Sequence, residues 1–83
     1  MSARPITVEV PDEVLLALRT DAAGFGREMK MLAAVKLYEL GRLTSSLAAD
    51  LAGCSRVEFL LSLGRYRVFP FEGELAELEA RRR

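Results

Sequence analysis

The sequence predicts a mainly α fold: an N-terminal β-strand, then a helical bundle containing a helix-turn-helix, and a short C-terminal extended segment and helix. Apolar residues recur at helical spacing through the middle of the chain, whereas residues 6–10 alternate as a half-buried strand does. Glycines punctuate the helical segments. A length of 83 residues indicates one domain over residues 1–83.

The predicted strand covers residues 6–10, ITVEV. Ile6, Val8 and Val10 face one side, and the polar residues between them face the other. Because one strand is not stable alone, its partner is another segment or the same strand of a second subunit. Strand, helix, helix is also the order of a ribbon-helix-helix protomer, in which paired strands enter the major groove of DNA. The segment therefore predicts a dimer contact, with a DNA contact as a further interpretation.

Two helices are predicted on either side of a glycine-containing break. Pro11 and the two acids after it favour a helix over residues 12–20. Residues 22–26, Ala-Ala-Gly-Phe-Gly, predict an interruption, and a long helix then runs over residues 27–40. Gly41 is suited to end this helix.

The long helix is apolar on two sides. Met31, Val35 and Tyr38 form one stripe, and a second stripe lies nearly opposite. This pattern is typical of a central core helix. It also fits a helix that packs on its own domain with one stripe and on another subunit with the other, and on that interpretation these three residues bind a partner.

A helix-turn-helix is predicted over residues 44–64, with its helices at about 44–52 and 55–64. Gly53 suits the left-handed position that ends the first helix. The spacing of Ser55 and Glu58 is that of a capping box for the second helix. An ordinary αα-hairpin is the alternative.

The outward face of the second helix mixes polar and apolar side chains. We expect Arg56 to contact a guanine edge and Ser55 a phosphate. Leu60 and Leu61, on the same expected face, suit a protein contact at least as well. The residues expected to contact DNA are Arg42, Ser55, Arg56, Arg65 and Arg67.

The C-terminal part is predicted to be extended over residues 66–71, where Pro70 excludes a central strand, and helical over residues 73–83. Two leucines give the terminal helix too little apolar surface to be stable alone, so it is expected to dock on a partner or on the bundle. The residues expected to bind a second subunit or a partner are Ile6, Val8, Val10, Met31, Val35, Tyr38, Leu60, Leu61, Leu75, Leu78, Arg81, Arg82 and Arg83.

The composition argues against an enzyme. The chain has no histidine and one cysteine, Cys54, which excludes a histidine triad, a zinc cluster and a disulfide within the chain. We therefore expect no catalytic residue, metal, cofactor or small-molecule substrate. Neither a signal peptide nor an apolar run of ~20 residues is visible, which predicts a cytoplasmic protein that does not enter a membrane.

Charge and hydropathy bear on the partners. The formal net charge is zero, so the chain as a whole gives no electrostatic support to nonspecific nucleic-acid binding. Hydrophobic residues make up 51% of this short chain. A body this small buries its apolar residues incompletely, which suggests that another chain covers part of its surface.

The segments ITVEVPDEVLLAL and LAAVKLYELGRLTSSLAADLAGCSRVEFLLSLGRY resemble the uncharacterised protein family UPF0175, a group of small prokaryotic proteins. The resemblance covers about residues 6–79 and is most specific over residues 36–64. It implies a helix-turn-helix, antitoxin-like protein associated with PIN-like ribonuclease toxins, and it implies no catalytic set. Arg81, Arg82 and Arg83 depart from the acidic run usual in the family. The matching positions are Tyr38, Gly41, Ala48, Ala49, Ala52, Gly53, Ser55, Glu58 and Phe59.

The functional expectation is an antitoxin-like regulator that forms a homodimer. It would bind double-stranded DNA through the helix-turn-helix or the N-terminal strand, and mask a PIN-like nuclease toxin with its C-terminal segment. The acids of residues 72–79 would block a basic toxin site, or the three terminal arginines would meet metal-binding carboxylates. The alternatives are a stand-alone DNA-binding transcriptional regulator and a protein-interaction module without DNA binding.

Overall fold

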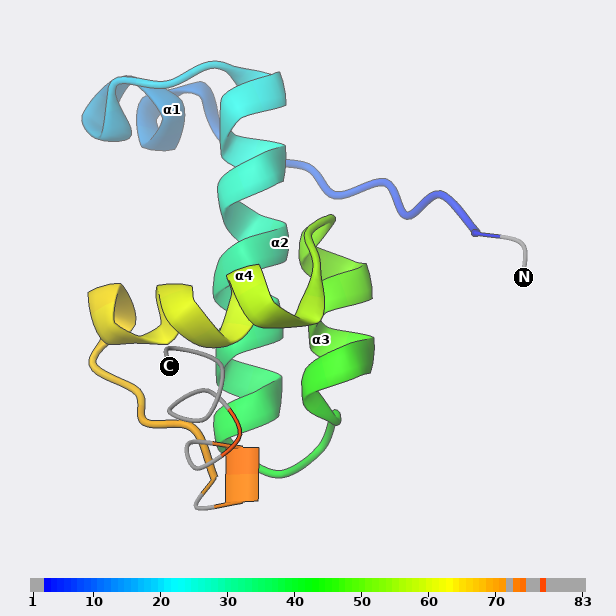
Figure 1. The fold of residues 1–83 in the computed structure, drawn as a ribbon. Coiled ribbons are helices and arrows are strands. Elements are labelled where there is room, and N and C mark those ends of the chain that lie inside the picture. The colour runs from blue at the N-terminus through cyan, green and yellow to red at the C-terminus, as the bar shows by residue number, and fades with distance from the viewer. Residues whose placement is uncertain (1–2, 72, 75–76, 78–83) are drawn as a thin grey trace.

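The computed structural model describes residues 3–71, 73–74 and 77, and these residues form four α-helices, one short 3₁₀ helix and no strand (Figure 1). The prediction of a mainly helical chain is confirmed. Figure 1 shows α2 as the long axis of the molecule, with α3 beside its second half and α4 lying across both. The elements are α1 Asp12–Leu18, α2 Ala22–Glu39, α3 Ser45–Ala52, α4 Arg56–Ser62 and the 3₁₀ helix η1 Leu63–Tyr66.

The N-terminal arm, residues 3–11, leaves the helical body and runs into solvent (Figure 1). The strand predicted at residues 6–10 is wrong for the single chain, because no described segment pairs with this backbone. The side chain of Ile6 is 85% exposed and that of Val8 56%, while Val10 is half-buried. The alternating apolar face that the sequence shows is therefore present but uncovered.

Helix α1 ends at Arg19, which takes the left-handed conformation and donates its backbone N–H to the carbonyls of Leu15 and Leu16. The break predicted at residues 22–26 is wrong, since α2 already starts at Ala22. Asp21 caps this start by accepting a hydrogen bond from the backbone N–H of Gly24 at 2.7 Å. The cap and the adjoining turns place the real interruption at residues 19–21, in front of the glycines.

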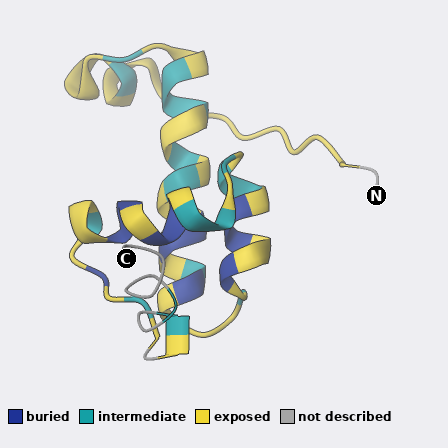
Figure 2. Cartoon of the chain, viewed as in Figure 1, coloured by how far each residue is buried: buried dark blue, intermediate teal, exposed yellow. Residues whose placement is uncertain are grey.

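The hydrophobic core lies where α2, α3 and α4 meet, and Figure 2 shows buried residues concentrated there. Tyr38, Phe59 and Leu63 are its largest fully buried side chains. The rings of Tyr38 and Phe59 meet edge to face with centroids 5.6 Å apart, a favourable aromatic geometry. Ala48 and Ala49 are also buried, and their small side chains let α3 approach α2 and α4 closely.

Burial within this core corrects three expectations about partner contacts. Val35 is 5% exposed, Tyr38 is fully buried and Leu60 is 3% exposed. The side of α2 that carries Val35 and Tyr38 therefore faces α3 and α4 and not another subunit, and Leu60 points from α4 into the same core. Met31 packs at the edge of the same cluster, half-buried.

The turn between α3 and α4 follows the local signals in the sequence. Gly53 has φ +81° and ends α3, donating its N–H to the carbonyls of Ala49 and Asp50. Ser55 and Glu58 form the expected capping box: the Ser55 hydroxyl accepts from the Glu58 N–H at 3.1 Å, and the Glu58 carboxylate accepts from the Ser55 N–H at 3.2 Å. The two helices are thereby fixed on either side of a three-residue connection.

After α4 the chain tightens into η1 and reverses direction at Arg67, whose φ is 58°. The extended segment predicted at residues 66–71 is wrong at its start, because Tyr66 ends η1 and Arg67 forms a turn. Residues 68–71 are irregular backbone, with Val68 buried and Phe69 84% exposed. Of the terminal helix predicted at residues 73–83, Gly73, Glu74 and Glu77 are helical. The remaining residues of that prediction lie outside the described part of the chain.

Candidate macromolecule-binding site

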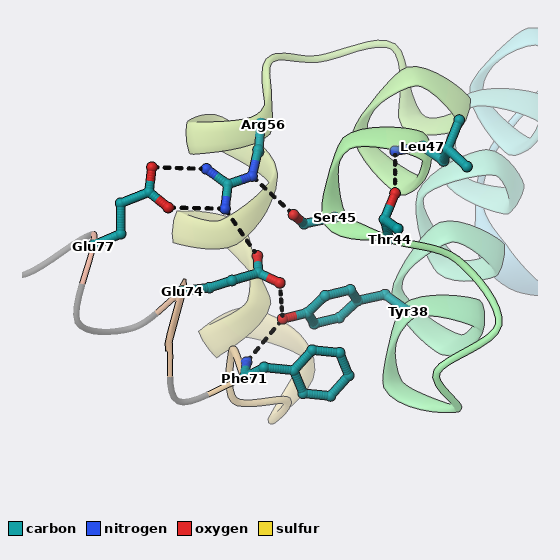
Figure 3. Close-up of polar contacts among 8 residues, drawn as sticks. All are labelled: Tyr38, Thr44, Ser45, Leu47, Arg56, Phe71, Glu74 and Glu77. Atoms are coloured by element: carbon teal, nitrogen blue, oxygen red, sulfur yellow. Dashed lines mark hydrogen bonds and ion pairs between the residues drawn. The ribbon is translucent and has the colours of Figure 1, made fainter.

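Arg56, the first residue of α4, lies at the centre of a polar cluster (Figure 3). Its Nε donates to the Ser45 hydroxyl at 2.9 Å, which ties the start of α4 to the start of α3. Its two terminal nitrogens donate to the two carboxylate oxygens of Glu77 at 3.0 and 2.9 Å. This is a bidentate guanidinium–carboxylate pair, the strongest geometry for such a contact.

Glu74 occupies the space between Arg56 and the core. One carboxylate oxygen accepts a hydrogen bond from the Tyr38 hydroxyl at 3.3 Å, and the other lies 3.5 Å from Arg56 Nη2. That second oxygen is buried and has no hydrogen bond among the described residues, so only the charge of Arg56 stabilises it. Tyr38 of α2 and Arg56 of α4 therefore hold Glu74 and Glu77 of the C-terminal segment, and Ser45 of α3 orients Arg56.

Tyr38 also holds the C-terminal segment at Phe71, three residues before Glu74. Its hydroxyl accepts a hydrogen bond from the backbone N–H of Phe71 at 2.9 Å, and the two rings lie 4.8 Å apart at a tilt of 34°. Burial raises the pKa of the Tyr38 hydroxyl, and the nearby Glu74 raises it further. Tyr38 therefore remains a neutral donor to Glu74 across the physiological range.

The charge of Arg56 is similarly secured. Its hydrogen bonds to Glu77 raise the pKa of the guanidinium, and the charges of Glu77 and Glu74 act in the same direction. Its side chain is 32% exposed. The residue that was expected to reach a guanine edge is thus permanently cationic, but its donors are directed at carboxylates of its own chain.

Of the other residues expected to contact DNA, Ser55 directly precedes Arg56, and the three arginines lie on other segments. Ser55 is exposed at the start of α4, whereas Arg65 lies nine residues along the chain, a span of roughly 14 Å at helical rise. The Arg65 guanidinium packs over the Tyr66 ring at 5.8 Å. Arg42 lies in the exposed loop after α2, and Arg67 is exposed in the turn after η1. Arg42, Arg65 and Arg67 therefore lie on segments other than the start of α4, where Ser55 and Arg56 lie.

An uncovered apolar surface lies at the other end of the molecule. Helix α1 has no buried residue, and Leu16 and Leu18 on it are 76% and 50% exposed. A shallow open depression separates α1 from the start of α2, with Leu15 and Leu16 in its lining. The exposed apolar side chains of residues 6–18, which include Ile6 and Val8 on the arm and Leu16 and Leu18 on α1, are together called the N-terminal apolar surface.

Of the remaining residues expected to bind a partner, one is exposed and the others are not described by the structure. Leu61 is 56% exposed on the outer side of α4, as expected, next to the buried Leu60. Leu75, Leu78, Arg81, Arg82 and Arg83 lie outside the described residues.

Sequence reasoning missed the pairing of Glu74 and Glu77 with Arg56. The signal for it was the three-residue spacing of the two glutamates, which places both on one face of a helix. No local rule identifies their cation, because Arg56 lies 21 residues away from Glu77.

The described residues contain no helix that is both long enough and apolar enough to cross a bilayer. Fold and site define a small helical protein in which a capped helix pair presents an arginine, and the C-terminal segment closes over that arginine. The chain belongs to the uncharacterised protein family UPF0175, whose family model matches residues 1–81. No curated protein and no solved structure matches the chain.

Proposed function

We propose that this protein is an antitoxin-like regulator that forms a homodimer through its N-terminal apolar surface, binds DNA, and binds a PIN-like ribonuclease toxin through its C-terminal segment. The observation that carries the proposal is the amount of surface that the single chain leaves uncovered. The identity of the toxin class comes from the family resemblance, and the other two activities rest on the surfaces described above.

The single chain has more surface than a compact protein of its mass. Its accessible surface is 6720 Å², whereas a folded monomer of 9.2 kDa is expected to have about 4,900 Å². The radius of gyration is 14.5 Å, against about 12 Å for a compact chain of this length. Because a stable interface buries about 800 Å² on each partner, the excess suffices for one.

The arm is self-complementary, which favours a second copy of this chain as the partner. In an antiparallel pairing centred on Val8, Ile6 lies opposite Val10 of the other copy, and Thr7 opposite Glu9. All apolar residues then share one face. A shift of two residues would place Glu9 opposite its own copy, a like-charge pair that destabilises the sheet.

Solution mass tests the dimer. The wild-type protein should have about twice the mass of 9.2 kDa. Val8→Lys places two lysines opposite each other on the apolar face and should give a monomer. The matched control is Thr7→Lys, which places the same charge on the polar face opposite Glu9 and should leave the dimer intact. A monomeric wild-type protein at high concentration would overturn this part of the proposal.

DNA binding is supported by the shape of the α3–α4 pair and by the position of Arg56 and Ser55 at the start of α4. This is the part of a recognition helix that contacts base edges in helix-turn-helix proteins. The test is binding to the promoter DNA of its own gene as salt is raised. Arg56→Ala should relax base preference, whereas Arg42→Ala should weaken binding to all sequences alike. An absence of any complex at low salt would remove DNA from the proposal.

Toxin binding is tested by co-expression with a PIN-like ribonuclease from the same genome. A complex should co-purify, and a chain truncated after Pro70 should no longer inhibit the nuclease. Full inhibition by the truncated chain would show that the C-terminal segment is not the inhibitory part.

One observation favours a second candidate, an interaction module that contacts protein only. Leu61 is exposed on α4, and Phe69 and Phe71 are 84% and 50% exposed on the segment that follows. Such large apolar side chains suit a protein surface better than a phosphate backbone. Leu61→Lys should abolish a protein contact, whereas on the DNA-binding interpretation the added cation should strengthen DNA binding.

A further inference from the structure

We infer that Tyr38, Ser45 and Arg56 form a receptor for a pair of anionic groups, and that the C-terminal segment fills this receptor with Glu74 and Glu77 in competition with the phosphates of DNA. The contacts of the two glutamates with this receptor are present in the structure. The competition with DNA rests on the proposed function.

The receptor is built from three helices that the core already holds together. Tyr38 comes from α2, Ser45 from α3 and Arg56 from α4, and the Ser45 hydroxyl orients the guanidinium through Nε at 2.9 Å. This leaves both terminal nitrogens of Arg56 directed at the C-terminal segment (Figure 3). A guanidinium presented in this way matches a phosphate as well as it matches a carboxylate.

The occupant is held by contacts that a competing anion can replace. Glu77 meets Arg56 at 2.9 Å with its side chain 42% exposed, so solvent screens the pair. Glu74 is more deeply placed, at 19% exposure, but its buried oxygen has no hydrogen bond within the described residues. Its 3.5 Å ion pair with Arg56 offsets only part of the cost of burying an acceptor without a hydrogen bond.

Release of the segment has a defined consequence for α4. Arg56 would retain its bond to Ser45 and so remain oriented, while its terminal nitrogens would be open to a phosphate. A partner that takes the C-terminal segment for itself would therefore increase DNA affinity, and by linkage DNA would increase the affinity for that partner.

The experiment measures binding of a labelled duplex of about 20 base pairs, two helical turns, by fluorescence anisotropy at low salt. The double variant Glu74→Gln with Glu77→Gln keeps the shape of both side chains and removes their charges. The matched control, Glu28→Gln with Glu39→Gln, removes the same charge from exposed positions on α2. We expect the double variant to bind about tenfold more tightly than the control, given the strength of bidentate charged pairs. Adding Arg56→Ala should abolish that gain.

Two outcomes overturn the inference, and they are distinguishable. Equal affinities for the double variant and the control would eliminate the competition and leave the DNA-binding proposal standing. If neither the double variant nor the wild-type protein bound DNA at low salt, both would fall. A second measurement observes the contact directly: the Arg56 Nη–H resonances, whose nitrogens donate to Glu77, should exchange with water more slowly in the wild-type protein than in the double variant. Identical exchange rates would show that the segment does not cover Arg56 in solution.

Discussion

The hydroxyl of Tyr38 accepts a hydrogen bond from the backbone N–H of Phe71 at 2.9 Å, across 33 residues of sequence. The same hydroxyl donates to Glu74 at 3.3 Å, so one oxygen anchors both the irregular segment and the first acid after it. Because the Tyr38 ring is fully buried against Phe59, packing in the core holds the hydroxyl oxygen in place. The C-terminal segment is thus fastened to the core rather than simply lying on it.

Stability should fall in alkali because of Tyr38. Its pKa is raised by burial above the ordinary value of 10.0, so the folded state favours the neutral hydroxyl. The contribution of this group is fully present below that ordinary value, and is lost as pH rises through the folded-state pKa. Urea unfolding from about pH 8 to about pH 11 should show the loss. Tyr38→Phe, which has no ionisable hydroxyl, should show a weaker decline over the same range.

Leu60 and Leu61 should respond very differently to the same change. Leu60 is 3% exposed and packs in the core, so Leu60→Ala should cost about 2–5 kcal/mol of unfolding free energy. Leu61 is 56% exposed, so Leu61→Ala should alter stability by no more than ~0.5 kcal/mol. Denaturant unfolding of the two variants measures this. Equal losses at the two positions would contradict the orientation of α4.

Gly53 should resist replacement for conformational reasons alone. Its φ is +81°, and nothing lies within 4 Å of a Cβ added there, so the cost of Gly53→Ala is backbone strain of about 1–2 kcal/mol. Gly64 provides the control, because it has the same open space without a positive φ. Thermal unfolding should show a clear loss for Gly53→Ala, and at most a small change for Gly64→Ala.

Cys54 should react slowly with alkylating reagents at neutral pH. Burial raises the pKa of its thiol, and the charge of Glu58 raises it further. The reactive thiolate is therefore scarcer than in an ordinary cysteine. Alkylation by iodoacetamide followed by mass spectrometry should be faster in denatured than in native protein, and the native rate should rise steadily with pH. A native rate equal to the denatured rate at neutral pH would rule out this environment.

The elements that sequence predicted well are those specified by neighbouring residues. Gly53 and the Ser55–Glu58 pair defined the turn before α4, because caps depend on residues within one turn of one another. Asp21 carries the same kind of local signal at the start of α2, whereas the break at residues 22–26 was predicted from the glycines after it. In the structure the cap at Asp21 prevails, and α2 runs through both glycines.

The features that sequence could not specify depend on which face of a helix meets which neighbour. Leu60 and Leu61 are adjacent and chemically identical, so only the placement of α4 against Tyr38 decides which is buried. The partner of Arg56 within the chain likewise depends on how distant segments pack. The position of Arg56 at the start of α4 was predicted. Its hydrogen bonds to Glu77 were not, because they depend on the path of the chain after Arg67.

The unbroken course of α2 bears on geometry at a larger scale. At helical rise its 18 residues span about 27 Å, from the N-terminal apolar surface to the core beside α4. If two copies meet through their arms, the length and twist of α2 set both the separation and the relative orientation of the two Arg56 side chains. One alanine inserted near Leu32 would turn one end by about 100° against the other, and so misalign any target that must engage both copies.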